Sequence, residues 1–101
     1  MVAQLVSWYE QNHAALQARG LAVSLDQSPA DGRDKPSAWV RVLGVDAEAE
    51  MIVWDSGECE LWGPVRTPSM PGTDPQAEHL QLDTDAEFAA AIDRMLSIFE
   101  A

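Results

Sequence analysis

The pattern of hydrophobic and polar positions predicts a β-hairpin in the middle of the chain. Residues 51–54 form an apolar run and residues 58–61 alternate between acidic and apolar positions, with Asp55-Ser56-Gly57 between the two runs. Asp and Ser can bond their own local backbone and Gly accepts a positive φ, so these three residues are typical of a turn. The two runs are therefore expected to pair as antiparallel strands.

The length of this turn decides which side chains share a face of the sheet. A three-residue turn with Gly57 in the left-handed conformation places four apolar residues on one face, which we expect to be the core face: Met51, Val53, Cys59 and Leu61. The other face then carries Ile52, Trp54, Glu58, Glu60 and Trp62. A two-residue turn would bury Glu60 beside Val53, and burying a carboxylate is costly. We therefore predict the three-residue turn.

Both ends of the chain show helical periodicity. Residues 2–19 have apolar positions at helical spacing, and Gly20 follows as a C-terminal cap. Near the other end, Thr84 and Glu87 fit a capping box that starts a helix running to about residue 100. Its apolar stripe is Phe88, Ile92, Met95, Leu96 and Phe99.

Three further runs are predicted as strands. Residues 21–25, 37–43 and 77–82 alternate between apolar and polar positions. In the second run, small and β-branched residues are expected to face the core, which leaves Trp39 and Arg41 on the other side. Residues 63–76 contain four prolines and are predicted to be irregular.

The order of these elements predicts a single α+β domain spanning residues 1–101. We expect an antiparallel sheet of about four or five strands, with the N- and C-terminal helices packed on one face. Two helices can cover only that one face. The other face must therefore stay exposed to solvent or bind something.

The charge of the chain restricts the kind of partner. Six Lys and Arg residues oppose seventeen Asp and Glu residues, which gives a formal net charge of −11. This field repels nucleic acid and anionic membranes and attracts basic proteins. No apolar run is long enough to span a membrane, and no signal peptide is visible. Cys59 is the only cysteine, so no intramolecular disulfide is possible, and we expect a cytoplasmic protein.

No residue pattern indicates catalysis. His13 and His79 lack the spacing of metal ligands, and Ser56 is not part of a GxSxG motif. Glu58 and Glu60 share a strand face, but a catalytic pair would need burial to separate the two pKa values. We therefore expect no enzymatic activity, no cofactor and no metal.

Recognition of a protein is better supported. Trp39, Trp54 and Trp62 share the face opposite the core, and Glu58 and Glu60 lie between them. Tryptophan is enriched at interface hot spots, and acidic side chains steer a basic partner. We predict that these five residues bind the partner. Alternatively, the tryptophans pack on one another across strands or lie beneath residues 63–76.

The order of these features resembles the TriTu immunity proteins of bacterial polymorphic-toxin systems. The resemblance is carried by Trp8-Tyr9-Glu10 in the first helix, the strand around Trp39, the segment Ile52-Val53-Trp54-Asp55-Ser56-Gly57-Glu58 and the acidic C-terminal helix. It implies a cytoplasmic protein that binds and neutralises the toxin domain encoded beside it. It does not imply which toxin activity is blocked.

Three hypotheses follow. The favoured one is an immunity protein that occludes a basic toxin C-terminal domain, such as a nuclease, with carboxylates in place of the phosphates that a nuclease expects. The second is an acidic secretion chaperone that wraps an unfolded segment of an exported effector. The third is a small acyl- or nucleotide-handling enzyme, which would require a pocket with convergent polar groups.

Overall fold

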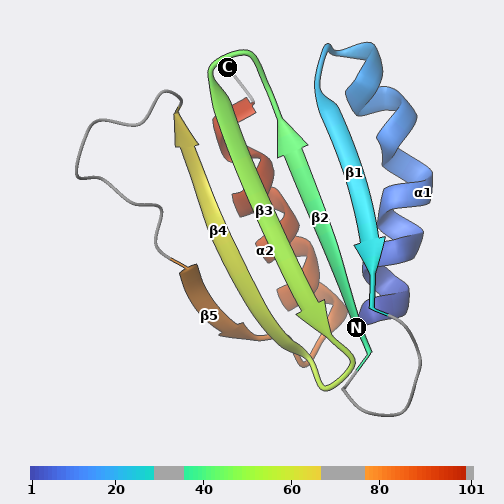
Figure 1. Ribbon diagram of the computed structural model, residues 1–101. Helices are drawn as coiled ribbons and strands as arrows, with labels where there is room; N and C mark the ends of the chain where they lie inside the picture. Colours follow the sequence, from blue (N-terminus) through green and yellow to red (C-terminus); the bar gives the residue numbers. More distant parts are fainter. Residues whose placement is uncertain (29–35, 67–76, 100–101) are drawn as a thin grey trace.

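In the described part of the chain, a five-stranded antiparallel sheet packs with two α-helices (Figure 1). The computed structural model describes residues 1–28, 36–66 and 77–99. Along the chain the elements are α1 (Val2–Ala18), β1 (Ala22–Gln27), β2 (Ser37–Leu43), β3 (Ala47–Trp54), β4 (Glu58–Arg66), β5 (Ala77–Gln81), α2 (Asp85–Leu96) and the short 3-10 helix η1 (Ser97–Phe99). The strands lie in chain order across the sheet. The predicted α+β class and element order are confirmed.

Both helices pack on the same face of the sheet (Figure 1). The strands bury every second residue, and in β2 these are Ala38, Val40 and Val42, each with no exposed surface. The helices contribute apolar side chains to the same cluster: Leu5 and Leu16 from α1, and Phe88, Ala91, Ile92 and Met95 from α2. The core therefore lies between the sheet and the helices, and no helix of the described residues covers the opposite face.

The hairpin between β3 and β4 has the predicted register. Met51 pairs with Leu61 and Val53 pairs with Cys59, and all four of these side chains are at most 2% exposed. Gly57 has a φ of +91°, as the three-residue turn requires. The prediction of a wholly apolar core face on this hairpin is confirmed.

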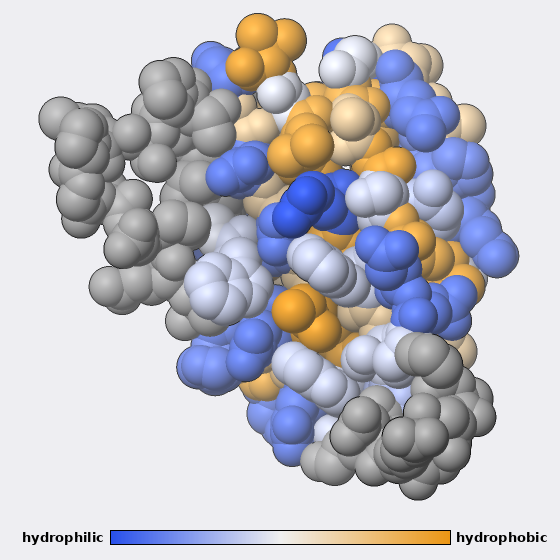
Figure 2. Space-filling model, viewed as in Figure 1, coloured by the Kyte–Doolittle hydropathy of each residue, from blue (hydrophilic) through white to orange (hydrophobic). Residues whose placement is uncertain are grey.

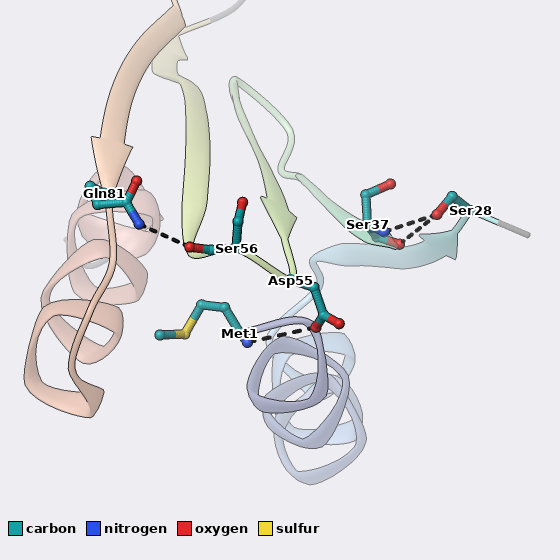
Figure 3. Close-up of polar contacts among 6 residues, drawn as sticks. All are labelled: Met1, Ser28, Ser37, Asp55, Ser56 and Gln81. Atoms are coloured by element: carbon teal, nitrogen blue, oxygen red, sulfur yellow. Dashed lines mark hydrogen bonds and ion pairs between the residues drawn. The ribbon is translucent and has the colours of Figure 1, made fainter. Parts of the chain in front are cut away.

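The hairpin turn is held from two sides by other parts of the chain (Figure 3). The Gln81 side-chain amide at the end of β5 donates a hydrogen bond to the carbonyl oxygen of Ser56, at 3.0 Å. On the other side, the Met1 ammonium lies 4.0 Å from a carboxylate oxygen of Asp55. These contacts fix the position of the residues that flank the turn.

Strand β4 is longer than the sequence predicted. Residues 63–66 were expected to be irregular because of their glycine and proline, but β4 continues to Arg66. The pairing register with β3 shifts between Glu48 and Glu50, and Gly63 has a φ of +81°. Such a bulge needs a left-handed residue and interrupts the hydrogen-bond ladder, so it can accommodate Pro64, which lacks an N–H group. Residues 67–76 lie outside the described part of the chain.

The predicted helix ends are largely confirmed. The Thr84 hydroxyl accepts a hydrogen bond from the Glu87 backbone N–H at 3.1 Å, which caps α2. The hydroxyl also donates to the Glu87 carboxylate, at 3.1 Å. At the end of α1, Gly20 has a φ of +87°, and the Arg19 guanidinium donates to the carbonyl oxygen of Phe99. That last contact joins the end of the first helix to the end of the chain's helical C-terminal region.

Candidate protein-binding site

The uncovered side of the sheet is organised in rows that run across the strands. The middle row contains one residue from each strand: Asp26, Trp39, Ile52, Glu60 and His79. Because side chains alternate along a strand and neighbouring strands are in register, these five side chains project from the same face. The row therefore places an apolar centre between acidic and polar residues.

Two further rows flank the middle one. Towards the hairpin turn, Ser37 pairs with Trp54, and Glu58 pairs with Gln81. On the other side, the row runs Ser24, Arg41, Glu50 and Trp62. We call the surface formed by these three rows the open face. Figure 2 shows hydrophilic and hydrophobic residues interspersed on this side of the molecule.

All five residues predicted to bind a partner lie on the open face. Trp39 is 37% exposed and Glu58 is exposed, whereas Trp54, Glu60 and Trp62 are half-buried. The structure brings Trp54, Glu58 and Glu60 to one hollow. It places Trp39 and Trp54 at a second hollow, and Trp62 beside Glu50 in the adjacent row.

The first hollow, which we call the acidic hollow, lies over the end of β3 and over β4 and β5. It encloses about 620 Å³. Its open-face residues are Trp54, Glu58, Glu60, His79 and Gln81. Nδ1 of His79 lies 3.5 Å from a carboxylate oxygen of Glu60, so the two form an ion pair whenever the imidazole is protonated. The acidic hollow thus combines an indole wall with carboxylates.

The second hollow, which we call the tryptophan cleft, lies over β2 and β3. It encloses about 380 Å³ between Trp39, Ile52 and Trp54. At its end, the Ser37 backbone N–H donates to the Ser28 hydroxyl at 2.9 Å, a contact drawn in Figure 3. Trp54 lines both hollows, which therefore adjoin at this residue. The cleft offers apolar surface where the acidic hollow offers charge.

Arg41 is part of this surface, although the sequence suggested no role for it. Its guanidinium carbon lies 5.4 Å from the Trp39 ring centroid, within cation–π range. Its Nε donates to the Glu50 carboxylate at 2.7 Å. Alternation placed Arg41 and Trp39 on one face, but the pairing with Glu50 depends on the register between β2 and β3. An Arg two residues after a Trp in a strand was the available signal.

Cys59 lies beneath this surface on the core face, and its thiol is unreactive. Its side chain is 2% exposed, and burial raises the pKa of its thiol from 9.0 to about 11, with a further upward contribution from the charges of Glu60 and Glu78. The thiolate is the nucleophilic form of cysteine, so this thiol is unreactive near neutral pH. Cys59 therefore acts as a small core residue.

Three further observations concern the described residues. A separate hollow of about 620 Å³ lies between α1 and α2, on the helical side, next to Trp8 and Phe88. Within residues 1–28, 36–66 and 77–99, three potential metal ligands do not come together at any point. The helices of these same segments include none that could cross a membrane.

Comparison with known families identifies the family of the chain. Residues 3–61 match the model of the immunity protein TriTu, which is more than half of the 101-residue chain. The match runs from α1 to the middle of β4 and includes Trp39, Trp54, Glu58 and Glu60, whereas Trp62 and His79 lie beyond it. Comparisons with curated proteins and with solved structures gave no significant match. The resemblance predicted from the sequence is confirmed, and the chain belongs to the TriTu family of immunity proteins.

Proposed function

We propose that this immunity protein neutralises a toxin domain by binding it stoichiometrically through the open face of the sheet. The observation that supports the proposal is the placement of three tryptophans and interleaved carboxylates on a face that no helix of the described residues covers. Folding does not require tryptophan at these positions, because the opposite face supplies the core. Their bulk is therefore available for a partner.

The open face has the composition of a protein interface. Its centre is the tryptophan cleft, where Trp39, Ile52 and Trp54 present apolar surface. Asp26 on one side and Glu60 on the other provide a charged rim. Interfaces commonly have an aromatic centre that loses its water and a polar rim that stays solvated. The tryptophans would supply the affinity and the rim would orient the partner.

The charge of the protein indicates a basic partner. The net charge of −11 raises the rate at which a positively charged domain arrives, and the carboxylates of the open face direct it to that side. A nuclease toxin fits this description because its active site binds phosphates and is therefore positively charged. In this proposal the carboxylates occupy the phosphate positions and block the toxin's active site.

The test is co-expression with the toxin domain encoded by the neighbouring gene, combined with association kinetics on the purified pair. The variant Glu58→Lys/Glu60→Lys should lose protection and should associate at least about tenfold more slowly, because it reverses the charge of the docking surface. The control is Glu10→Lys/Asp93→Lys, which changes the net charge equally at exposed positions on the helices. Equal effects of the two variants on association would contradict the open face as the docking surface.

The secretion-chaperone alternative makes a different prediction. A chaperone that wraps an exported effector would bind the unfolded toxin domain in preference to the folded one. We expect the reverse, because the tryptophan cleft and the acidic hollow are preformed and suit a folded surface. Calorimetry with folded toxin and with a destabilised toxin variant distinguishes the two.

A further inference from the structure

We propose that the acidic hollow binds an arginine side chain of the partner, with the guanidinium stacked on Trp54 and paired with Glu60. The proposal rests on the proposed function in that the arginine belongs to the toxin. It goes further by assigning one hollow of the open face to one kind of side chain.

The protein itself shows how a guanidinium binds on this sheet. Arg41 lies over the Trp39 ring, at 5.4 Å from its centroid, and donates to the Glu50 carboxylate at 2.7 Å. Arg41 and Glu50 are direct partners across β2 and β3. Trp39 is two residues from Arg41 on the same strand, so indole, guanidinium and carboxylate form a compact set. We call Trp39, Arg41 and Glu50 the internal arginine set.

The acidic hollow repeats this arrangement across the next pair of strands. Trp54 on β3 takes the place of Trp39, and Glu60 on β4 takes the place of Glu50. The residue directly across from Glu60, and two positions from Trp54, is Ile52. Ile52 therefore stands where the internal arginine set has Arg41. Trp54 and Glu60 thus keep the indole and the carboxylate of that set, while the strand position that supplies the guanidinium is occupied by isoleucine.

The hollow has the size and the polarity for a guanidinium that arrives from outside. Its volume of about 620 Å³ is in the range of ligand sites in proteins and exceeds what one side chain fills. The Glu60 side chain is 28% exposed, so it is accessible to a partner and partly shielded from water. His79 is 76% exposed beside it, and its ring can rotate away without disturbing the core.

Arginine suits the hollow better than lysine. The guanidinium is planar and therefore stacks on an indole, while its N–H groups stay in the plane and bond a carboxylate at the edge. The ammonium of lysine is compact and strongly hydrated, and it cannot stack in this way. The chemistry of the internal arginine set also involves a guanidinium. We therefore expect selectivity for arginine over both lysine and neutral analogues.

The experiment is an NMR titration of the full chain with N-acetyl-arginine methylamide, following the four tryptophan indole N–H signals assigned with Trp→Phe variants. We expect a saturable shift of the Trp54 signal and little change at Trp8, which lies on the helical side. The citrulline counterpart has nearly the same shape without the charge and should leave Trp54 unchanged. Glu60→Gln should weaken binding of the arginine probe by about fivefold or more, since a charge-assisted bond is lost.

A variant that supplies its own guanidinium to Glu60 tests the comparison with the internal arginine set directly. Ile52→Arg places a guanidinium across from Glu60 and should abolish binding of the probe, whereas the polar but uncharged Ile52→Gln should keep it. Ile52 is half-buried on the open face, so both variants are expected to fold. Circular dichroism and the unchanged Trp8 signal verify the fold.

Two results would overturn the inference: equal shifts with the citrulline probe, or binding that survives Ile52→Arg. Neither result would affect the proposed function, because protection in co-expression depends on the whole open face. Conversely, if the arginine probe binds as expected but Glu58→Lys/Glu60→Lys still protects against the toxin, the proposed docking surface fails while the arginine site stands.

Discussion

The two faces of the sheet are built by the same strands but are governed by different requirements. Cys59 and Glu60 are neighbours in β4, yet the first is 2% exposed in the core and the side chain of the second is 28% exposed on the open face. On the core face, stability depends on apolar area removed from water and on close packing. On the open face, little of the folding free energy depends on side-chain identity. A pattern of tryptophan and glutamate there is thus informative about binding.

The hairpin turn determines which residues lie on the core face and which lie on the open face. A shift of one residue in the pairing would exchange the faces, because side chains alternate with a period of two. Gly57 in the left-handed conformation sets the turn length, and its carbonyl oxygen accepts a hydrogen bond from the Leu82 backbone N–H at 2.8 Å. The same turn thus positions Val53 in the core and Trp54 on the open face.

The largest expected effect is a difference in stability between variants of two adjacent residues whose side chains lie on opposite faces of the sheet. Leu61→Ala should lower the free energy of unfolding by about 2–5 kcal/mol, because Leu61 has no exposed surface and its loss leaves a cavity. Glu60→Ala, one residue away, should change it by less than about 1 kcal/mol. Urea unfolding followed by circular dichroism measures both values. Similar losses for the two variants would refute the assignment of stability to one face.

A smaller loss of stability is expected at the hairpin turn, which determines the face on which each side chain lies. Gly57→Ala should cost about 2–4 kcal/mol, because the backbone is left-handed and the new Cβ would lie 2.5 Å from the Leu82 carbonyl oxygen. Gly20→Ala is the matched control: its φ is +87° but the space around it is open, so only the backbone strain of about 1–2 kcal/mol applies. Thermal unfolding of the two variants isolates the close approach. Equal costs would show that strain alone matters at Gly57.

The smallest effect concerns the pH dependence of the folding stability that the buried Cys59 thiol contributes. The pKa of the Cys59 thiol is raised from 9.0 to about 11 by burial, so the unfolded chain releases this proton more readily than the folded one. The stability linked to Cys59 is therefore fully present below pH 9 and is lost as the pH rises through 11, by about 3 kcal/mol in total. Urea unfolding at pH 8 and at pH 10.5 measures this loss. Cys59→Ala should show a shallower decline, since only other groups then titrate; an identical decline would contradict the linkage.

The hairpin shows which features of the fold can be predicted from local sequence patterns. Its register followed from one energetic choice, because the alternative turn would have buried Glu60 beside Val53. The helices followed from periodicity and from the Thr84 cap, which the structure confirms. The extent of β4 did not follow, because proline was interpreted as the end of regular structure. Gly63 turns that position into a bulge, and a bulge depends on the partner strand as much as on its own residues.

For the candidate site, the sequence determined which residues are on the open face, and the tertiary structure decided how they combine. Alternation alone placed Trp39, Trp54 and Glu60 opposite the core. Their grouping into hollows required the registers of β2 with β3 and of β4 with β5, which join His79 to Glu60 and Arg41 to Glu50. Alternation is a property of each strand by itself, whereas register is set by turns and by burial across the whole sheet. That is why the sequence alone could assign residues to the open face, whereas the placement of Ile52 across from Glu60, where the internal arginine set has Arg41, came only from the register of the strands.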